Sequence, residues 1–206
     1  MIAMPTLVLA SASPRRAEIL RNIGWPFEAV AADIDESRFA HEDAPAYVTR
    51  VARAKAEEVR LRVPGATIVA ADTVVVVDGE ILGKPRDEED ARRMLRLLQG
   101  RSHEVLTGVT VFNGSTVEPR TAHEVTEVNF AEMNEDEVDW YVSSGEPMDK
   151  AGAYAIQGLG ARFIKGIKGE YSNVVGLPVR LLYELISSGP VFKGACPGAP
   201  PIESPD

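Results

Sequence analysis

The feature that most limits the fold of this chain is a valine-rich, largely apolar run at residues 68–77. β-branched side chains favour strands over helices. Asp78-Gly79 follows the run directly, and this dipeptide is a strong signal for a two-residue hairpin turn into Glu80–Leu82. The pattern therefore predicts a buried strand over Thr67–Val77, with an antiparallel partner paired to its end.

Strand and helix patterns alternate along the rest of the chain. Further strands are expected at residues 6–10, 27–31, 105–112 and 116–130, with strand-like pieces within 152–169. Helices are expected at residues 14–23, 45–62, 88–98, from Asn134 to just before Gly145, and 178–188. Because several of the strand pairs are hairpins, we predict an α/β fold in which helices flank a mixed, twisted sheet.

The last part of the chain has a different composition. From Gly189 onward it is rich in proline and glycine and poor in apolar periodicity. Such a segment buries too little apolar surface to offset the entropy of ordering it. We therefore predict one domain over residues 1–188 and a flexible tail over residues 189–206.

Composition limits the class of protein. The net charge of −9 disfavours a binder of polymeric nucleic acid, although a few lysines and arginines can still form a local pocket for a small anion. Cys196 is the single cysteine, so no internal disulfide can form, which suits a reducing compartment such as the cytoplasm. No apolar run is long enough to cross a membrane. The apolar N-terminal stretch is interpreted as a strand rather than a signal peptide, because its arginines, Arg15 and Arg16, follow it.

Asp72 interrupts the apolar run at residues 68–77. A buried, unpaired carboxylate is energetically costly, so this side chain needs a metal ion, a cation or hydrogen-bond donors. Catalysis and metal binding are two such settings. The alternative is a structural aspartate that accepts backbone hydrogen bonds where the strand bends.

Two arginines stand where a helix begins. If Ser13 is the N-cap and Pro14 the first helical residue, Arg15 and Arg16 lie in the first turn, where the helix dipole disfavours cations. An anion bound there would reverse this, since free N–H groups, Ser11, Ser13 and two guanidinium groups would converge on a phosphate. Alternatively, both arginines are solvated and form salt bridges with a nearby carboxylate.

Two lysines and an acidic loop offer weaker signals. Lys55 lies on the apolar stripe of its helix, where it either reaches a cleft or extends to the stripe's edge. Lys84, between Gly83 and Pro85, precedes a helix and either faces a ligand or is solvated. Asp33, Asp35 and Glu36 form a loop that could supply oxygen ligands to Mg²⁺ or Mn²⁺, or could simply be solvated. His41, His103 and His123 lack zinc-site spacing, and Ser13 lacks the context of a serine nucleophile.

Taken together, several cations, at least one carboxylate and a helix N-terminus suit phosphate recognition and metal-assisted attack at phosphorus. The residues alone name neither the substrate nor the bond that is cleaved.

A series of motifs resembles the Maf family of nucleoside triphosphate pyrophosphatases. In order, they are ASASPRR at residues 10–16, ADT at 71–73, GKP at 83–85, HEVLTG at 103–108, DKAGAYAIQG at 149–158 and YSNVVGLP at 171–178. Their order and spacing hold from about Thr6 to Ile186. One such motif would be a weak signal, whereas the whole series is specific.

The resemblance implies an enzyme that hydrolyses a nucleoside triphosphate to its monophosphate and pyrophosphate, with a divalent cation, Mg²⁺ or Mn²⁺, as cofactor. It also implies a fold similar to that of the inosine triphosphatases, with two lobes around a cleft, and often a homodimer. Asp72 would be the catalytic proton acceptor and a metal ligand, with Glu36 and Asp35 as further candidate ligands. The positions that match family residues expected to bind substrate are Ser11, Arg15, Arg16, Lys55, Thr73, Lys84 and Gln157.

The segment around Gln157 indicates the subgroup that acts on dTTP and UTP, and a glutamine amide can pair with the carbonyl and N–H groups of a pyrimidine. Two alternatives stay open. One is a pyrophosphatase for 7-methyl-GTP or another modified nucleotide. The other is a nucleotide-sensing regulator of septum formation in dividing cells, for which turnover would be incidental.

Overall fold

A mixed sheet forms the centre of the protein. The computed structural model describes residues 5–114 and 116–187. The strands are β1 (Leu7–Leu9), β2 (Phe27–Ala29), β3 (Thr67–Val77), β4 (Glu80–Leu82), β5 (Ser102–Phe112), β6 (Arg120–Phe130) and β7 (Ile164–Lys168). They form a seven-stranded sheet in the order β2-β1-β3-β5-β6-β7, with β4 also paired to β3.

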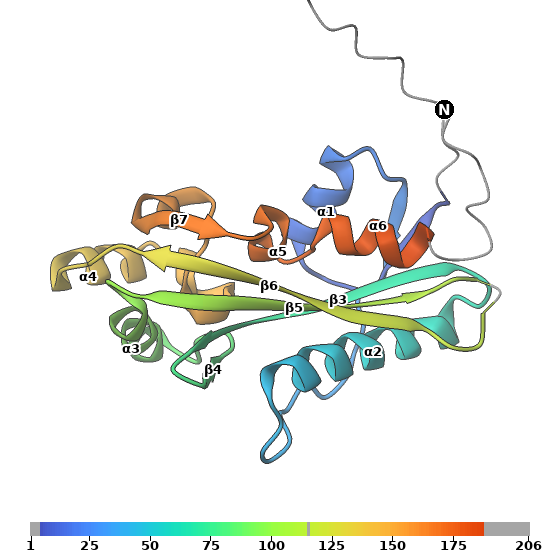
Figure 1. Ribbon diagram of the computed structural model, residues 1–206, viewed down its shortest axis with the longest axis horizontal. Coiled ribbons are helices and arrows are strands. Elements are labelled where there is room, and N and C mark those ends of the chain that lie inside the picture. Colours follow the sequence, from blue (N-terminus) through green and yellow to red (C-terminus); the bar gives the residue numbers. More distant parts are fainter. Residues whose placement is uncertain (1–4, 115, 188–206) are drawn as a thin grey trace, which may run out of the picture.

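Helices cover both faces of this sheet. They are α1 (Pro14–Asn22), α2 (Ala44–Arg62), α3 (Glu88–Leu98), α4 (Glu135–Ser143), α5 (Tyr171–Val175) and α6 (Val179–Ser187), with short 3-10 helices η1 (Glu146–Asp149), η2 (Ala151–Ala153) and η3 (Gly158–Phe163). In Figure 1, α1, α5 and α6 lie above the sheet and α2 lies below it, while α3 and α4 gather at the other end.

The pairing directions confirm the predicted mixed α/β fold. β1 pairs in parallel with β2 on one side and with β3 on the other. The long strands β3, β5 and β6 pair antiparallel, and β7 adds a further antiparallel strand. Asp78 and Gly79 both have positive φ, +49° and +79°, as the two-residue hairpin between β3 and β4 requires.

Strand alternation divides the core between two layers. Along β3, Val69 and Ala71 face α1 and α6, whereas Ile68 and Ala70 face α2. In the second half of β3, Val75 and Val77 belong to a separate apolar cluster with α3 and α4, whereas Val74 packs with Val48 of α2. The molecule therefore has two lobes, each with its own core, and β3, β5 and β6 run through both (Figure 1).

One edge of β3 is only partly covered. β1 pairs with residues 67–69 of β3, and β4 pairs with residues 75–77. Between them, residues 70–74 have no strand on this side within the described part of the chain. β1 is also the point where the chain reverses its direction of winding, since α1 leads to β2 on one side and α2 leads to β3 on the other. The carboxyl end of such a strand is where ligands bind in open α/β sheets.

Several predicted element boundaries were wrong. β5 begins at Ser102 rather than Val105, because Ser102 and His103 continue the pairing with β6. β6 begins at Arg120 rather than Thr116, since the Thr116 N–H turns back to the Asn113 carbonyl at 2.7 Å.

The glycine-rich stretch at residues 152–169 holds one strand, β7, and otherwise 3-10 turns. Positive φ at Gly152, Ala153 and Gly158 breaks any longer strand there. α5 was not predicted, and α6 begins at Val179, one residue after the predicted start at Pro178, while the predicted end at Ser188 lies outside the described residues.

The helix caps follow the sequence signals with one exception. Asp87 caps α3, and Asn134 with Glu137 forms the predicted capping box of α4. Ser13 occupies the N-cap position of α1 and Pro14 begins that helix, but the Ser13 side chain makes no capping hydrogen bond. The prediction of a Ser13 cap is therefore right for its position and wrong for its hydroxyl.

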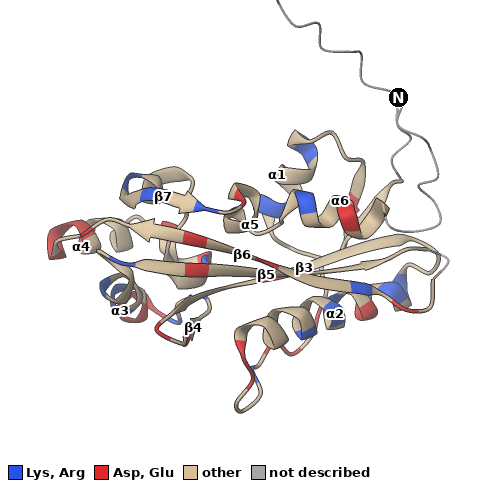
Figure 2. Ribbon diagram, viewed as in Figure 1, with Lys and Arg blue, Asp and Glu red and all other residues tan. Residues whose placement is uncertain are grey.

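Acidic and basic residues are interspersed along α2 and α3 in the view of Figure 2. None of the helices within residues 5–114 and 116–187 combines the length and hydropathy needed to span a bilayer. The predicted tail, residues 189–206, lies outside the described residues. The single-domain boundary at residue 188 and the cytoplasmic location stay predictions.

Candidate active site

The uncovered edge of β3 opens onto a cavity of about 600 Å³ between the two lobes. That is a usual size for a pocket that binds a small molecule. Of the ten residues that the sequence predicted for the site, nine line this cavity, namely Ser11, Arg15, Arg16, Glu36, Lys55, Asp72, Thr73, Lys84 and Gln157. Asp35 is not among the lining residues, and its carboxylate instead accepts a hydrogen bond from the Ser37 N–H at 2.9 Å.

A buried ion cluster lies on the α2 face of β3. The Lys55 ammonium donates to Asp72 Oδ1 at 2.8 Å and lies 2.9 Å from Glu36 Oε1. Asp72 and Lys55 are 7% and 8% exposed, so neither ion has its full hydration. Burial raises the pKa of Asp72, while Lys55 and Arg16 act in the opposite direction. Lys55 therefore turns into the cleft instead of extending to the edge of its apolar stripe. The buried carboxylate of Asp72 is paired with a cation, so it is not a structural aspartate that only accepts backbone hydrogen bonds at a bend in the strand.

Gly108 brings α2 close enough for this contact. It is the cross-strand neighbour of Asp72 on β5, and a Cβ atom at Gly108 would lie 2.3 Å from the carbonyl oxygen of Val48. Only glycine lets the helix backbone approach the sheet this closely. Lys55 follows Val48 by about two helical turns on the same face, so its ammonium reaches Asp72.

On the opposite face of β3, Arg16 is buried, and none of the described residues places a carboxylate in direct contact with it. Its guanidinium donates to the Gly176 carbonyl at 2.7 Å, to Thr73 Oγ1 at 3.0 Å and to Ser11 Oγ at 3.3 Å. Thr73 Oγ1 in turn pairs with Thr107 Oγ1 at 3.0 Å. Burial lowers the pKa of Arg16, and the charge of Asp72 partly offsets this effect. The cation thus has only neutral acceptors in contact, and this favours binding of an anion beside it.

Arg15, which directly precedes Arg16, has a different environment. It donates to Asp149 Oδ2 at 2.8 Å and to the Asp149 carbonyl at 3.0 Å. Its side chain is 24% exposed and that of Asp149 is 57% exposed. Each of the two interpretations of the arginine pair therefore holds for one arginine. Arg15 forms the salt bridge with a carboxylate, and Arg16 has the buried position facing the cavity.

The start of α1 adds backbone donors to the Arg16 side. Residues 10–16 all line the cavity. The Ser13 hydroxyl caps none of the N–H groups of the first turn, and the Ser13 N–H itself donates to Ser11 Oγ at 3.1 Å. Uncapped N–H groups at a helix N-terminus, together with a buried guanidinium, suit a phosphate.

The opposite wall of the cavity comes from residues 149–151 and 154–157, beside Lys84. Tyr154 is buried and its hydroxyl lies 2.6 Å from His103 Nε2. Burial lowers the pKa of His103 to about 4, so this histidine is neutral and structural at pH 7. The Glu146 carboxylate accepts hydrogen bonds from the N–H groups of Leu159 and Gly160, both at 2.9 Å. These bonds fix the chain that follows Gln157.

Comparison with known proteins shows the family to which this chain belongs. The sequence profile described as Maf-like protein matches residues 6–189. The chain belongs to the Maf family. A dTTP/UTP pyrophosphatase of Symbiobacterium thermophilum is 50% identical over 93% of this chain and 98% of that protein. A protein of the same name from Anaeromyxobacter dehalogenans is 54% identical over 85% of this chain and 89% of that protein.

Among solved structures, the Maf chain is similar to the Staphylococcus aureus Ham1 protein, with a TM-score of 0.47, 15% identity, and coverage of 77% of this chain and 79% of that one.

The donor set of this Maf protein partly fits the expected divalent cation. No group of three or more His, Cys, Asp or Glu side chains that could hold a metal ion exists among the described residues. Asp72 and Glu36, however, both contact the same ammonium group of Lys55. Mg²⁺ is commonly held by one or two carboxylates together with substrate phosphates and water. Asp72 and Glu36 therefore fit a cation that binds along with a nucleotide, whereas Asp35 does not line the cavity.

Four polar or charged residues of the cavity were missed as site candidates: Tyr47, Asp149, Lys150 and Tyr154. The last three lie in the DKAGAYAIQG segment, so the motif contained the signal, but no role had been assigned to them. Tyr47 had no signal, because one tyrosine early in a helix has no distinctive pattern. It lines the cavity from the start of α2, and its hydroxyl donates to the Glu36 carbonyl at 2.8 Å.

Proposed function

We propose that this Maf protein hydrolyses dTTP and UTP to the nucleoside monophosphate and pyrophosphate. The observation that carries the proposal is the pair of opposite charges across β3, with the buried carboxylate of Asp72 on one face and the buried guanidinium of Arg16 on the other. Attack of water at phosphorus needs both, a proton acceptor and a cation that stabilises negative charge. The names of relatives at about half identity supply the substrate class.

In the proposed reaction, the triphosphate lies against the Arg16 side of the cavity. Arg16, Ser11, Lys84 and the N–H groups at the start of α1 bind its phosphate oxygens, as such groups do elsewhere. Water attacks the α-phosphorus, the bond from this phosphorus to the bridging oxygen breaks, and pyrophosphate leaves. Asp72 accepts the proton from the attacking water. In the protein without a bound cation its pKa is raised by burial, which makes it a stronger base than an ordinary aspartate.

We also propose that Asp72 and Glu36 hold a divalent cation, Mg²⁺ or Mn²⁺, when the nucleotide is bound. Such an ion supplies Lewis-acid polarisation of the phosphate and lowers the pKa of water. The Lys55 ammonium contacts both carboxylates in the structure, so a cation bound there would take its place. Lys55 would then shift toward a phosphate oxygen.

Base selection is assigned to the opposite wall. Gln157 lines the cavity directly after the buried residues of the DKAGAYAIQG segment, and its amide offers both a donor and an acceptor to a pyrimidine. Arg15 and Thr73 are the other two residues to which the family resemblance gives a part in substrate choice.

The test is pyrophosphate release by the purified protein with Mg²⁺ or Mn²⁺, measured for dTTP, UTP, CTP, 7-methyl-GTP, ITP and the standard purine triphosphates. Release from dTTP and UTP that is lost in Asp72→Asn supports the proposal. Release from 7-methyl-GTP alone would keep the reaction and change the substrate. No release from any nucleotide would reject the enzyme and leave the regulatory interpretation. Light scattering of the same sample tests the expected homodimer.

A further inference from the structure

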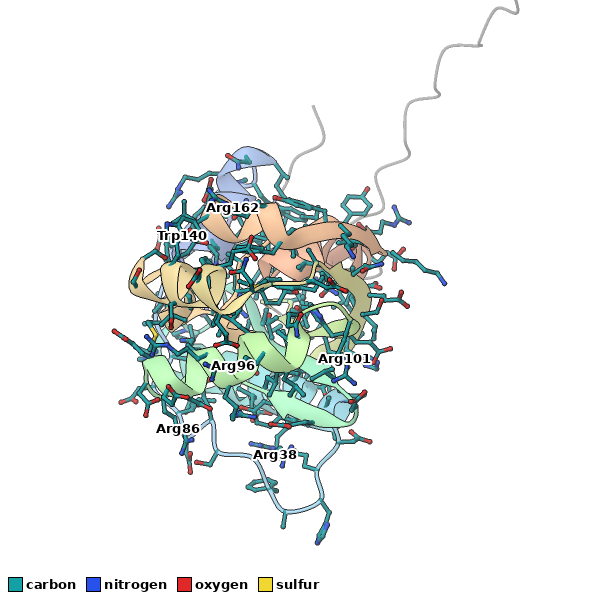
Figure 3. The ribbon with its side chains drawn as sticks, turned by 90° about the vertical axis from the view of Figure 1, so that its left-hand side faces the viewer. Arg38, Arg86, Arg96, Arg101, Trp140 and Arg162 are labelled. Carbon is teal, nitrogen blue, oxygen red and sulfur yellow. The ribbon has the colours of Figure 1, made fainter. Side chains whose placement is uncertain are left out.

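Two residues of the loop between β2 and α2 line the cavity, Ala32 and Glu36, and Glu36 is the charged one. This loop, residues 30–43, contains no helix or strand. Figure 3 shows its Arg38 at the lower edge of the molecule, away from the sheet. The Glu36 side chain is 51% exposed, so its contact with Lys55 at 2.9 Å does not follow from burial. Something else has to hold the loop in place for Glu36 to meet the Lys55–Asp72 pair.

Arg50 of α2 fastens the loop at three points. Its guanidinium makes a two-pronged salt bridge with Glu42, at 2.7 Å and 2.9 Å, and donates to the Ser37 carbonyl at 3.0 Å. The same group lies 4.0 Å from the centre of the Phe39 ring. The Glu42 carboxylate is only 9% exposed, unlike those of ordinary surface ion pairs. Planar, two-pronged contacts of this kind fix geometry as well as charge.

Tyr47, one helical turn before Arg50, contacts Glu36 itself. Its hydroxyl donates to the Glu36 carbonyl at 2.8 Å, and the Arg50 guanidinium lies 5.5 Å from its ring. Residues three apart lie on one face of a helix. α2 therefore carries Lys55 and, closer to its start, the two side chains that hold the loop whose carboxylate contacts Lys55.

We propose that Arg50 and Tyr47 are positioning residues for Glu36. They fix the loop so that the Glu36 carboxylate meets Lys55 beside Asp72, and neither takes part in the chemical step. The catalytic consequence rests on the proposed pyrophosphatase function, whereas the structural consequence does not.

The first measurement is amide hydrogen exchange of peptides covering residues 31–43. Arg50→Ala is expected to speed exchange there by about tenfold, because three anchoring contacts are lost. The matched control is Arg53→Ala, one turn further along α2, where the arginine pairs with Glu57 on an exposed surface. Unchanged exchange in Arg50→Ala would overturn the proposal whether or not the protein is an enzyme.

The second measurement is a double-mutant cycle on turnover. If Arg50 acts through Glu36, Arg50→Ala should lower kcat by roughly the same factor as Glu36→Gln, on the order of tenfold, and the double variant should be no worse than Glu36→Gln alone. Losses that multiply would mean that Arg50 acts by another route, and wild-type turnover in Glu36→Gln would remove the role of Glu36 itself. Both outcomes contradict the proposal.

A conservative variant covers the case in which Arg50→Ala folds poorly. Tyr47→Phe removes only the hydroxyl that contacts Glu36 and keeps the ring beside Arg50. It is expected to lower kcat by about threefold to fivefold, with the loss again absent in the Glu36→Gln background. An effect of the same size in both backgrounds would contradict the proposal. If wild-type protein releases no pyrophosphate, the proposed function fails and the exchange measurement still decides on the loop.

Discussion

The two faces of β3 at the cavity differ in how their charges are balanced. On the α2 face, Lys55 lies between two carboxylates, so the cluster retains a net negative charge. On the α1 face, Arg16 contacts only hydroxyl and carbonyl oxygens. Adjacent residues of a strand point to opposite faces, so Asp72 and Thr73 give one strand two chemically different sides. One side suits activation of water and the other suits a phosphate.

Asp72→Asn tests the carboxylate side and has the largest expected effect. The amide keeps the shape and a partner for Lys55 but cannot accept a proton. Loss of a general base lowers kcat by about 10²–10⁴-fold. Single-turnover pyrophosphate release measures the loss, and binding of an analogue with a non-hydrolysable α–β bridge should survive. A loss of less than threefold would move the proton acceptor elsewhere in the cavity.

Arg16→Ala tests the cationic side. A hydrogen bond to a charged group contributes about 1.5–3 kcal/mol, which corresponds to roughly a 10-fold to 150-fold loss in kcat/KM. The analogue should bind correspondingly more weakly, and the midpoint of the pH–rate profile should move to higher pH, because the charge of Arg16 helps to hold the pKa of Asp72 down. Arg21→Ala, on an exposed part of the same helix, is the matched control. If both variants bind the analogue equally well, the phosphate site lies elsewhere.

The pH dependence separates the two sides by titration. Only the ionised form of Asp72 accepts a proton, so kcat/KM should rise about tenfold per pH unit below its raised pKa and then level off. Lys55→Met removes the cation that most favours the ionised form, so the midpoint should move to higher pH. A midpoint that does not move in this variant would assign the titration to another group.

The same shift affects stability. Because the folded-state pKa of Asp72 lies above its ordinary value of 3.8, the native state binds more protons than the unfolded state between the two values. The stabilising contribution of this group is therefore fully present below pH 3.8 and is lost as the pH rises through the folded-state pKa. Urea unfolding of wild-type and Asp72→Asn protein over this range should show this slope in the difference between their free energies of unfolding, since the other carboxyl groups titrate in both proteins.

The sequence predicts features of this site that break a local pattern. Asp72 interrupts an apolar strand and Lys55 an apolar helix face, and both side chains turn into the cavity. The pattern does not separate Arg15 from Arg16, because adjacent residues on one helix turn share every local signal. Their difference depends on Asp149 and Gly176, which lie far along the chain. The hairpin at Asp78 was predictable for the opposite reason, since two adjacent residues determine it.

The smallest expected effect belongs to the ion pair that joins the two lobes. Asp149→Asn removes the charge facing Arg15 but leaves its carbonyl contact at 3.0 Å. The pair is partly exposed, and exposed ion pairs contribute about 0–1 kcal/mol, so KM should change by less than about fivefold with kcat unchanged. Raising the salt concentration should shrink even this difference, because ions screen exposed charges. Kinetics at low and high salt decide the matter. A hundredfold loss of kcat/KM that persists at high salt would contradict this expectation. It would show that Arg15 needs Asp149 as strictly as Arg16 needs its buried acceptors, so that the two arginines would differ only in their positions.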